Sequence, residues 1–276
     1  MADALTGTIR REVGGLVWFE PAQPLGGIGR IVMTTRIGGL SRDPYDSLNL
    51  AFHVDDVQER VRLNRLKLMS CVGRGLLDPV VGEQVHGIRV QTVGELHAGT
   101  RWQSREHALA GTDALVTVTP RLPLVTLVAD CAPVALIDPV QEVAAVIHAG
   151  WRGLAGGILD CTMTALADTW GSQPSDLVTW TGPTIGPCCY EVGPEVAEHF
   201  PSAVLPRAGD RSSLDLRCAI HYRLTAAGVQ AENASGLDLC TSCNPELFYS
   251  HRRATRYGQL TTGRQALLLW LEGHDD

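Results

Sequence analysis

Residues 114–147 read ALVTVTPRLPLVTLVADCAPVALIDPVQEVAAVI, and this segment gives the clearest indication of the fold class. It contains four short β-branched and aliphatic runs, at residues 114–118, 124–129, 134–137 and 143–147. Pro120, Asp130 and Asp138-Pro139 separate the runs, and residues of these types favour chain reversals. We therefore predict several short strands joined by turns at the centre of the protein.

Helical and further strand patterns flank this centre. Apolar residues recur at helical spacing in residues 56–72, 153–170 and 214–227. Further strands are predicted at residues 30–35, 177–181, 247–250 and 266–271. No Pro/Ser-rich linker or repeat divides the chain. We predict an α/β (mixed α+β) fold, with mixed sheets flanked by helices in a single compact domain over residues 28–276. Residues 1–27, rich in Gly, Pro and Ala, are predicted to be a partly ordered N-terminal extension.

The composition limits the partners and the compartment. The formal net charge of the 276 residues is -7, which disfavours nucleic acid and anionic membrane surfaces because no basic excess is present. The chain lacks an 18-residue apolar run and an N-terminal apolar segment typical of a secretory signal. We expect a cytoplasmic protein, a monomer or homodimer, whose eight cysteines are thiols or metal ligands and whose partners are small molecules.

His86, Cys131 and His148 each lie where an apolar run gives way to Gly or Pro. Two imidazoles and one thiolate form a ligand set that zinc accepts, and three protein ligands leave one position open for catalysis. The residue types alone favour a different interpretation, two hydrogen-bonded core histidines and a buried thiol, because free cysteine is among the most buried residue types.

Several motifs change that balance. They are TTRIGGLS at residues 34–41, SLNL at 47–50, QVHG at 84–87, ADC at 129–131, HAGWRG at 148–153, GPTIGPCCYEVG at 182–193 and TGR at 262–264. Together they resemble the laccase-domain family, first described as multicopper polyphenol oxidases and now as purine nucleoside phosphorylases. The resemblance covers most of the chain, although residues 53–56, HVDD, lack a glycine that the family usually has there.

This resemblance implies a site and an activity. The implied zinc ligands are His86, Cys131 and His148, with copper as the alternative metal. The implied reaction is phosphorolysis of adenosine, inosine and related nucleosides, including methylthioadenosine, with adenosine deamination as a second activity. The implied fold is that of the laccase domain, which is also compared with a bacterial deamidating toxin.

Phosphorolysis requires an anion site, and guanidinium groups match phosphate oxygens. The predicted phosphate-binding residues are Arg36, Arg65 and Arg152, each with ordinary surface charge as the alternative. Asn49, His53 and Gln84 complete the predicted substrate-binding set, although Asn49 could equally be a turn residue. The candidate carboxylates for proton transfer in deamination are Glu83, Asp113 and Asp130, of which Asp130 could instead bond to backbone or orient a ligand histidine.

Three other functions remain open. A copper-dependent polyphenol oxidase needs many ligands, and the nine histidines include no His-x-His pair, although a single His₂Cys copper site fits the ligand types. A hydrolase would use Cys131 as nucleophile with a histidine base. A non-enzymatic metal-binding protein would close the coordination sphere with a fourth protein ligand.

The sequence also contains a single C-x-x-C motif at Cys240 and Cys243 and an adjacent pair at Cys188 and Cys189. A structural zinc site at the C-x-x-C motif would need two further ligands. Without them, ordinary reduced thiols are expected at Cys240 and Cys243, and a packing role is expected for Cys188-Cys189.

Overall fold

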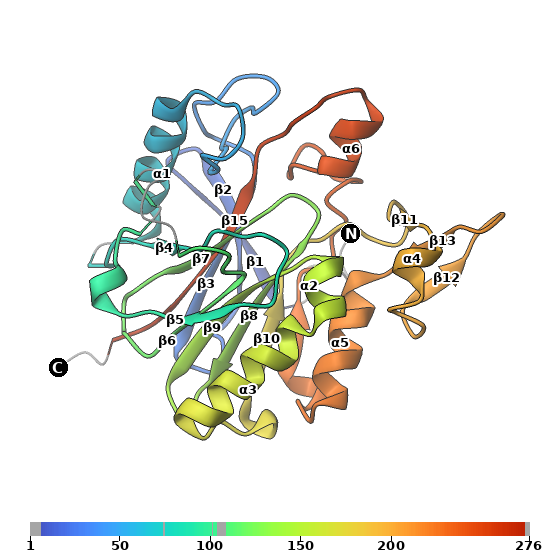
Figure 1. The fold of residues 1–276 in the computed structure, drawn as a ribbon. Coiled ribbons are helices and arrows are strands. Elements are labelled where there is room, and N and C mark those ends of the chain that lie inside the picture. The colour runs from blue at the N-terminus through green and yellow to red at the C-terminus, as the bar shows by residue number, and fades with distance from the viewer. Residues whose placement is uncertain (1–6, 74, 101, 104–108, 274–276) are drawn as a thin grey trace.

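Two six-stranded sheets form the centre of the protein (Figure 1). The computed structural model describes residues 7–73, 75–100, 102–103 and 109–273. In spatial order the first sheet consists of β1 (Thr8–Val13), β2 (Leu16–Pro21), β3 (Gly29–Thr34), β15 (Gln265–Leu271), β7 (Leu124–Val128) and β4 (Val80–Val81). The second consists of β14 (Ala234–Gly236), β10 (Val178–Thr181), β8 (Ala132–Asp138), β9 (Val143–Ala149), β6 (Ala114–Thr117) and β5 (Val90–Thr92). Both sheets mix parallel and antiparallel pairs, which confirms the predicted α/β class.

The described residues form six α-helices, and the longest of them cover the outer faces of this pair of sheets. The six helices are α1 (Gln58–Val72), α2 (Trp151–Gly156), α3 (Ile158–Trp170), α4 (Pro194–Ala197), α5 (Leu216–Ala226) and α6 (His251–Arg256). Apolar residues of α3 and α5 pack against the second sheet, and α1 packs against the first. In Figure 1, α3 and α5 lie side by side and α1 lies on the opposite side of the molecule. A small third sheet contains β11 (Glu191–Val192), β13 (Ser212–Leu214) and β12 (Val204–Pro206).

This layering explains why the central runs are apolar throughout rather than alternating. Every residue of β8, β9 and β15 is buried. One face of each strand contacts the other sheet and the opposite face contacts helices or loops. A strand buried on both faces needs apolar residues at successive positions, so its sequence loses the period of two. The four central runs are confirmed as β6, β7, β8 and β9.

The N-terminal residues 8–21 form β1 and β2 and belong to the first sheet, although the sequence predicted a partly ordered extension there. β2 pairs with β3, and Leu16, Val17, Trp18 and Phe19 are all buried. The Gly- and Pro-rich composition of this segment reflects its turns. The four successive apolar residues 16–19 nevertheless indicate a buried strand.

Three predicted elements need correction. The helix predicted at residues 153–170 is two helices, α2 and α3, because Gly157 takes a left-handed conformation with φ 92°. The late helix begins at Leu216 because residues 212–214 form β13. Residues 247–250 are not a strand: the side chain of Gln265 bonds to both backbone groups of Tyr249 in place of a neighbouring strand. Among the described residues, none of the helices is both long and apolar enough to cross a membrane.

Candidate metal centre and its cavity

His86, Cys131 and His148 come together at one end of the two sheets. His86 lies in the loop between β4 and β5, Cys131 lies where the chain passes from β7 in the first sheet to β8 in the second, and His148 lies near the end of β9. Their potential ligand atoms all lie within 4.8 Å of one another. Cys131 Sγ is 3.7 Å from His86 Nε2, and the two imidazole centroids are 4.8 Å apart. The tertiary structure therefore assembles the predicted triad.

The buried carboxylate of Asp113 orders two of these three residues. It accepts hydrogen bonds from the backbone N–H groups of Val85, His86 and Gly87 at 2.8–3.1 Å, which hold His86 in its left-handed conformation at φ 63°. Asp113 Oδ1 also lies 2.8 Å from Nδ1 of His148. This bond fixes the orientation of the His148 ring and leaves Nε2 for a metal. Carboxylates hold metal-binding histidines in the same way in zinc proteins. Asp113, which the sequence offered only as a proton-transfer candidate, is a positioning residue.

Asp130 positions Cys131 in a similar way. Its carboxylate accepts hydrogen bonds from the Thr241 hydroxyl and the Arg252 backbone N–H, both at 2.6 Å. Its backbone carbonyl accepts from Thr184 Oγ1 at 2.6 Å. Asp130 has φ 92°, a conformation that is strained for a residue other than glycine. The network thus holds the sharp turn that presents Cys131, which agrees with the alternative of backbone bonding.

The electrostatics of the triad favour a thiolate. Burial alone would raise the pKa of Cys131, but the charge of His148 and hydrogen bonds from His148 and His86 outweigh it and lower the pKa to about 6. Burial would lower the pKa of His148, but the Cys131 charge and the bond to Asp113 raise it to about 9. Thiolate is the form in which cysteine binds metals or attacks an electrophile.

The donor set and its surroundings fit a metal ion with one open position. A Cβ atom added at Gly150 would lie 2.8 Å from His86 Cδ2 and 3.0 Å from Cys131 Sγ, so glycine keeps this space clear. Two nitrogens and one sulfur are ligands that zinc accepts in catalytic sites. All three residues of the triad line a cavity.

This cavity has a volume of about 470 Å³, which is in the range of small-molecule sites. Seven of the predicted site residues line it: His53, Gln84, His86, Asp130, Cys131, His148 and Arg152. Gln84 exchanges two hydrogen bonds with the backbone of Leu127, and the Arg152 guanidinium lies over the Trp151 ring at 4.5 Å from its centroid. The cavity walls come from both sheets and from α2, α5 and α6.

Arg36 and Arg65 lie elsewhere and are held by other groups. Arg36 bonds to Asp46 and to the carbonyl of Pro245, and it lies over the Tyr249 ring. Arg65 is buried, donates to the carbonyls of Leu50 and Trp102, and packs on the rings of Phe52 and Trp102. Neither Arg36 nor Arg65 lines the cavity that contains the triad.

Asn49 is fully buried and does not line the cavity. Its side-chain oxygen accepts hydrogen bonds from the backbone N–H groups of Ala51 and Arg264 at 3.1 and 3.0 Å. Asn49 therefore affects the cavity indirectly. Its side chain holds the backbone of Arg264, and the Arg264 side chain lines the cavity.

Several cavity residues were missed as site residues from the sequence. They are Trp151, Tyr190, His251, Arg252 and Arg264. Trp151, Tyr190 and Arg264 lie in three of the motifs quoted above, and this could have identified them. Burial raises the pKa of Tyr190 well above its usual range, so its hydroxyl stays protonated. Burial, together with nearby Arg264, lowers the pKa of His251.

Comparison with known proteins agrees with the fold. Purine nucleoside phosphorylase YfiH of Shigella flexneri is 38% identical over 245 residues, covering 86% of this chain and 92% of that protein. Purine nucleoside phosphorylase PA4543 of Pseudomonas aeruginosa is 36% identical over 263 residues, covering 92% and 98%. The crystal structure of YlmD from Geobacillus stearothermophilus superposes with a TM-score of 0.85 at 34% identity, covering 95% of this chain and 98% of that one. Residues 30–272 match the family described as multi-copper polyphenol oxidoreductase laccase, and the chain belongs to this family.

Proposed function

We propose that this protein is a zinc-dependent purine nucleoside phosphorylase. Its substrates would be adenosine, inosine and related nucleosides, including methylthioadenosine, and adenosine deamination would be a second activity. The observation that carries this proposal is that one cavity contains both the His86–Cys131–His148 triad and three arginines, Arg152, Arg252 and Arg264. The names of the relatives support the same reaction class.

The triad residues would hold the zinc ion. When bound, zinc supplies Lewis-acid chemistry that polarises a substrate oxygen or nitrogen and stabilises developing negative charge. Asp113 keeps the His148 ring oriented, and Asp130 keeps Cys131 at the cavity wall. Asp113 thereby preserves the ligand geometry without lining the cavity.

The arginines would form the phosphate subsite. The Arg264 guanidinium already donates to the carbonyls of Thr262 and Gly263, and Arg252 donates to the carbonyl of Glu191. These bonds orient the two groups and leave further N–H donors for phosphate oxygens. In phosphorolysis a phosphate oxygen bonds to ribose C1′ while the C1′–N9 bond breaks, and the bonding electrons leave with the purine. Fixed cations would keep the attacking anion beside C1′.

His53, Gln84, Tyr190 and His251 would bind the nucleoside. The lowered pKa of His251 favours a neutral ring, which can donate one hydrogen bond and accept another. The Tyr190 hydroxyl remains a donor at neutral pH. For deamination, Asp130 is the remaining carboxylate at the cavity wall, since Glu83 and Asp113 do not line it.

Product analysis tests the proposal. The protein is incubated with adenosine with and without phosphate. Phosphate-dependent adenine and ribose 1-phosphate are expected, and inosine formed without phosphate would indicate deamination. Folded, zinc-loaded protein that forms neither product would overturn the proposal. Metal analysis in the same preparation separates zinc from copper, and oxidation of a polyphenol by an intensely blue copper form would favour the oxidase.

Matched arginine variants test the phosphate subsite. Arg264→Ala and Arg252→Ala should raise KM for phosphate more than KM for adenosine. Arg62→Ala is the control, because Arg62 is an exposed residue of α1 paired with Glu59 and lies outside the cavity. An unchanged phosphate KM in both cavity variants would exclude these residues as the anion site.

A Cys–His hydrolase is the second candidate, and one observation favours it. Asp113, His148 and Cys131 form a carboxylate–imidazole–thiol series that resembles a nucleophilic triad. The same three residues serve both hypotheses, and the metal separates them. If chelation leaves activity intact while thiol alkylation abolishes it, the hydrolase is correct and the zinc mechanism fails.

A further inference from the structure

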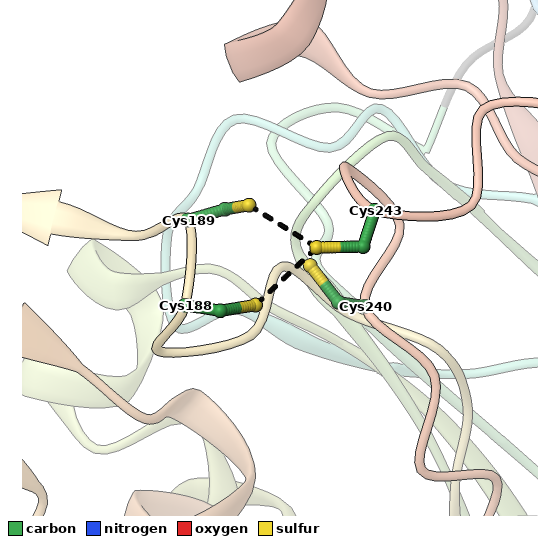
Figure 2. A group of neighbouring side chains, drawn as sticks. All are labelled: Cys188, Cys189, Cys240 and Cys243. Atoms are coloured by element: carbon green, nitrogen blue, oxygen red, sulfur yellow. Dashed lines mark hydrogen bonds between the residues drawn. The ribbon is translucent and has the colours of Figure 1, made fainter. Parts of the chain in front are cut away.

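A second group of potential metal ligands lies outside the cavity. Cys188 and Cys189 approach Cys240 and Cys243, and the four sulfur atoms all lie within 4.8 Å of one another. Figure 2 shows the four side chains pointing toward a common centre from two separate loops. All four are free thiols. The C-x-x-C motif at Cys240 and Cys243 thus acquires the two additional ligands that a structural zinc site requires.

The topology of the second sheet brings these loops together. β10 and β14 are parallel neighbours, so the chain leaves both strands at the same end of the sheet. Beyond them Thr184 and Cys240 form a parallel bridge, and the Thr241 N–H donates to the carbonyl of Thr184 at 3.0 Å. The cysteine pairs therefore come from loops that are fixed beside each other by backbone pairing.

The sulfur geometry fits a tetrahedral ion. Sulfurs bound to zinc at about 2.3 Å lie about 3.8 Å apart at the corners of a tetrahedron. Cys243 Sγ is 3.5 Å from Cys188 Sγ and 3.4 Å from Cys189 Sγ. The Gly186 N–H donates to Cys240 Sγ at 3.2 Å, the type of bond that stabilises a metal-bound thiolate. The other sulfur pairs lie within 4.8 Å, so shifts of up to about 1 Å would complete a coordination shell with zinc–sulfur bonds of about 2.3 Å.

Positive charge surrounds the cluster and suits an anionic tetrathiolate centre. Three guanidinium groups donate to carbonyls of the two loops: Arg207 to Cys188, Arg256 to Cys189 and Arg253 to Ser242, at 3.2–3.4 Å. Four thiolates around one divalent zinc ion carry a net charge of about −2. The nearby arginines would offset that charge.

We propose that Cys188, Cys189, Cys240 and Cys243 bind a structural zinc ion that fastens the two loops together. Four protein ligands close the coordination sphere, so this site would be structural, unlike the triad with its open position. The fastened loops form part of the catalytic cavity. Tyr190 follows Cys189 and lines the cavity, and Thr241 holds the Asp130 carboxylate beside Cys131. This inference is independent of the proposed phosphorylase activity.

Zinc content in matched variants tests the proposal. Purified wild-type protein should contain about two zinc ions per chain. A Cys240→Ser/Cys243→Ser variant should lose one, and a His86→Ala/Cys131→Ser variant should lose the other. Cys218→Ser is the control, because Cys218 is an exposed thiol outside both clusters. The His86→Ala/Cys131→Ser variant separates the two hypotheses, since its remaining zinc reports only the four-cysteine site.

The same variant can be loaded with cobalt to identify the ligands. Tetrahedral cobalt bound by four thiolates absorbs intensely in the visible range, with a sulfur charge-transfer band. This spectrum should appear in His86→Ala/Cys131→Ser and weaken when Cys188 or Cys189 is additionally changed to Ser. A spectrum unaffected by Cys188→Ser and Cys189→Ser would overturn the four-cysteine assignment.

Thiol alkylation of native wild-type protein avoids any variant that fails to fold. Cys188, Cys243 and Cys218 are all exposed, so iodoacetamide can reach each of them when no metal is bound. The rate of each cysteine is therefore compared before and after a chelator is added. We expect Cys188 and Cys243 to be protected until a chelator is added, while Cys218 reacts throughout. Alkylation rates of Cys188 and Cys243 that do not change on chelation, a disulfide among the four cysteines in place of zinc, or iron with inorganic sulfide at this site would each overturn the proposal.

Discussion

The Asp113 carboxylate bonds to three successive backbone N–H groups and to the ring of His148. Asparagine has nearly the same shape but replaces one oxygen with an NH₂ group, which cannot accept these bonds. We predict that Asp113→Asn lowers zinc affinity about 10- to 100-fold, the usual effect of losing a carboxylate that orients a metal-binding histidine. Competition with a chromophoric chelator measures it.

Asp160→Asn is the control for this change, because Asp160 is more than half exposed and pairs only with Arg223 among the contacts described. Its zinc affinity should equal that of the wild type. Unchanged affinity in Asp113→Asn as well would show that the Asp113–His148 bond does not orient the ligand.

Gly150 is the second residue on which the metal centre depends. Its backbone is extended, at φ -78° and ψ 164°, so alanine meets no conformational strain there. The added methyl group would instead press on His86 and Cys131. We predict that Gly150→Ala lowers zinc affinity by about an order of magnitude, an effect similar to losing a residue that orients a metal ligand. Circular dichroism should still show the native fold.

Gly94→Ala provides the comparison, because its new methyl group would meet only Thr119 Oγ1 at an ordinary 3.5 Å. It should bind zinc normally. If Gly150→Ala also binds zinc with wild-type affinity, the close approach at Gly150 has no functional meaning.

Among the elements, the break between α2 and α3 has the clearest sequence origin. Gly157 takes φ 92° and its N–H caps α2 by donating to the carbonyls of Gly153 and Leu154. The break lets α2 carry Trp151 and Arg152 to the cavity while α3 packs along the second sheet. One continuous helix over these residues would have a single axis and could not do both.

We predict that Gly157→Ala destabilises the protein by about 1–2 kcal/mol, because a left-handed conformation is unfavourable for alanine. Gly157→Asn should cost less, because asparagine tolerates this conformation better. Urea unfolding monitored by circular dichroism measures both. A stabilised alanine variant would indicate that the helix is continuous and that Gly157 only weakens it.

At the scale of the whole molecule, the N-terminal hairpin is part of the core. Phe19 is 2% exposed and packs among residues of both large sheets. It also packs against Phe248, with 6.2 Å between the ring centroids. We predict that Phe19→Ala destabilises the protein by about 3–5 kcal/mol, the usual cost of emptying a buried phenylalanine site. Arg10→Ala, on exposed β1, should change stability by less than about 0.5 kcal/mol.

Chemical denaturation of the two variants measures the difference. Equal stabilities would mean that the hairpin adds little to the stability of the core. The hairpin was missed because Gly and Pro in its turns dominate the composition, whereas its burial depends on β3 and on residues more than 200 positions away.

The central strands and the His86–Cys131–His148 triad could be predicted from the sequence alone. The runs in residues 114–147 are apolar at nearly every position because both faces of these strands are buried, and that requirement is visible locally. The motifs around His86, Cys131 and His148 were sufficient to predict the triad that the structure assembles.

Which other residues lie beside the triad could not be predicted without the tertiary structure. Arg65 and Arg264 are chemically identical in the sequence, yet Arg65 binds the carbonyls of Leu50 and Trp102 while Arg264 lines the cavity. Likewise, Cys188-Cys189 and Cys240-x-x-Cys243 are separated by about fifty residues and meet only because β10 and β14 pair. A residue's type fixes which bonds it can form, but chain topology fixes which partners are within reach.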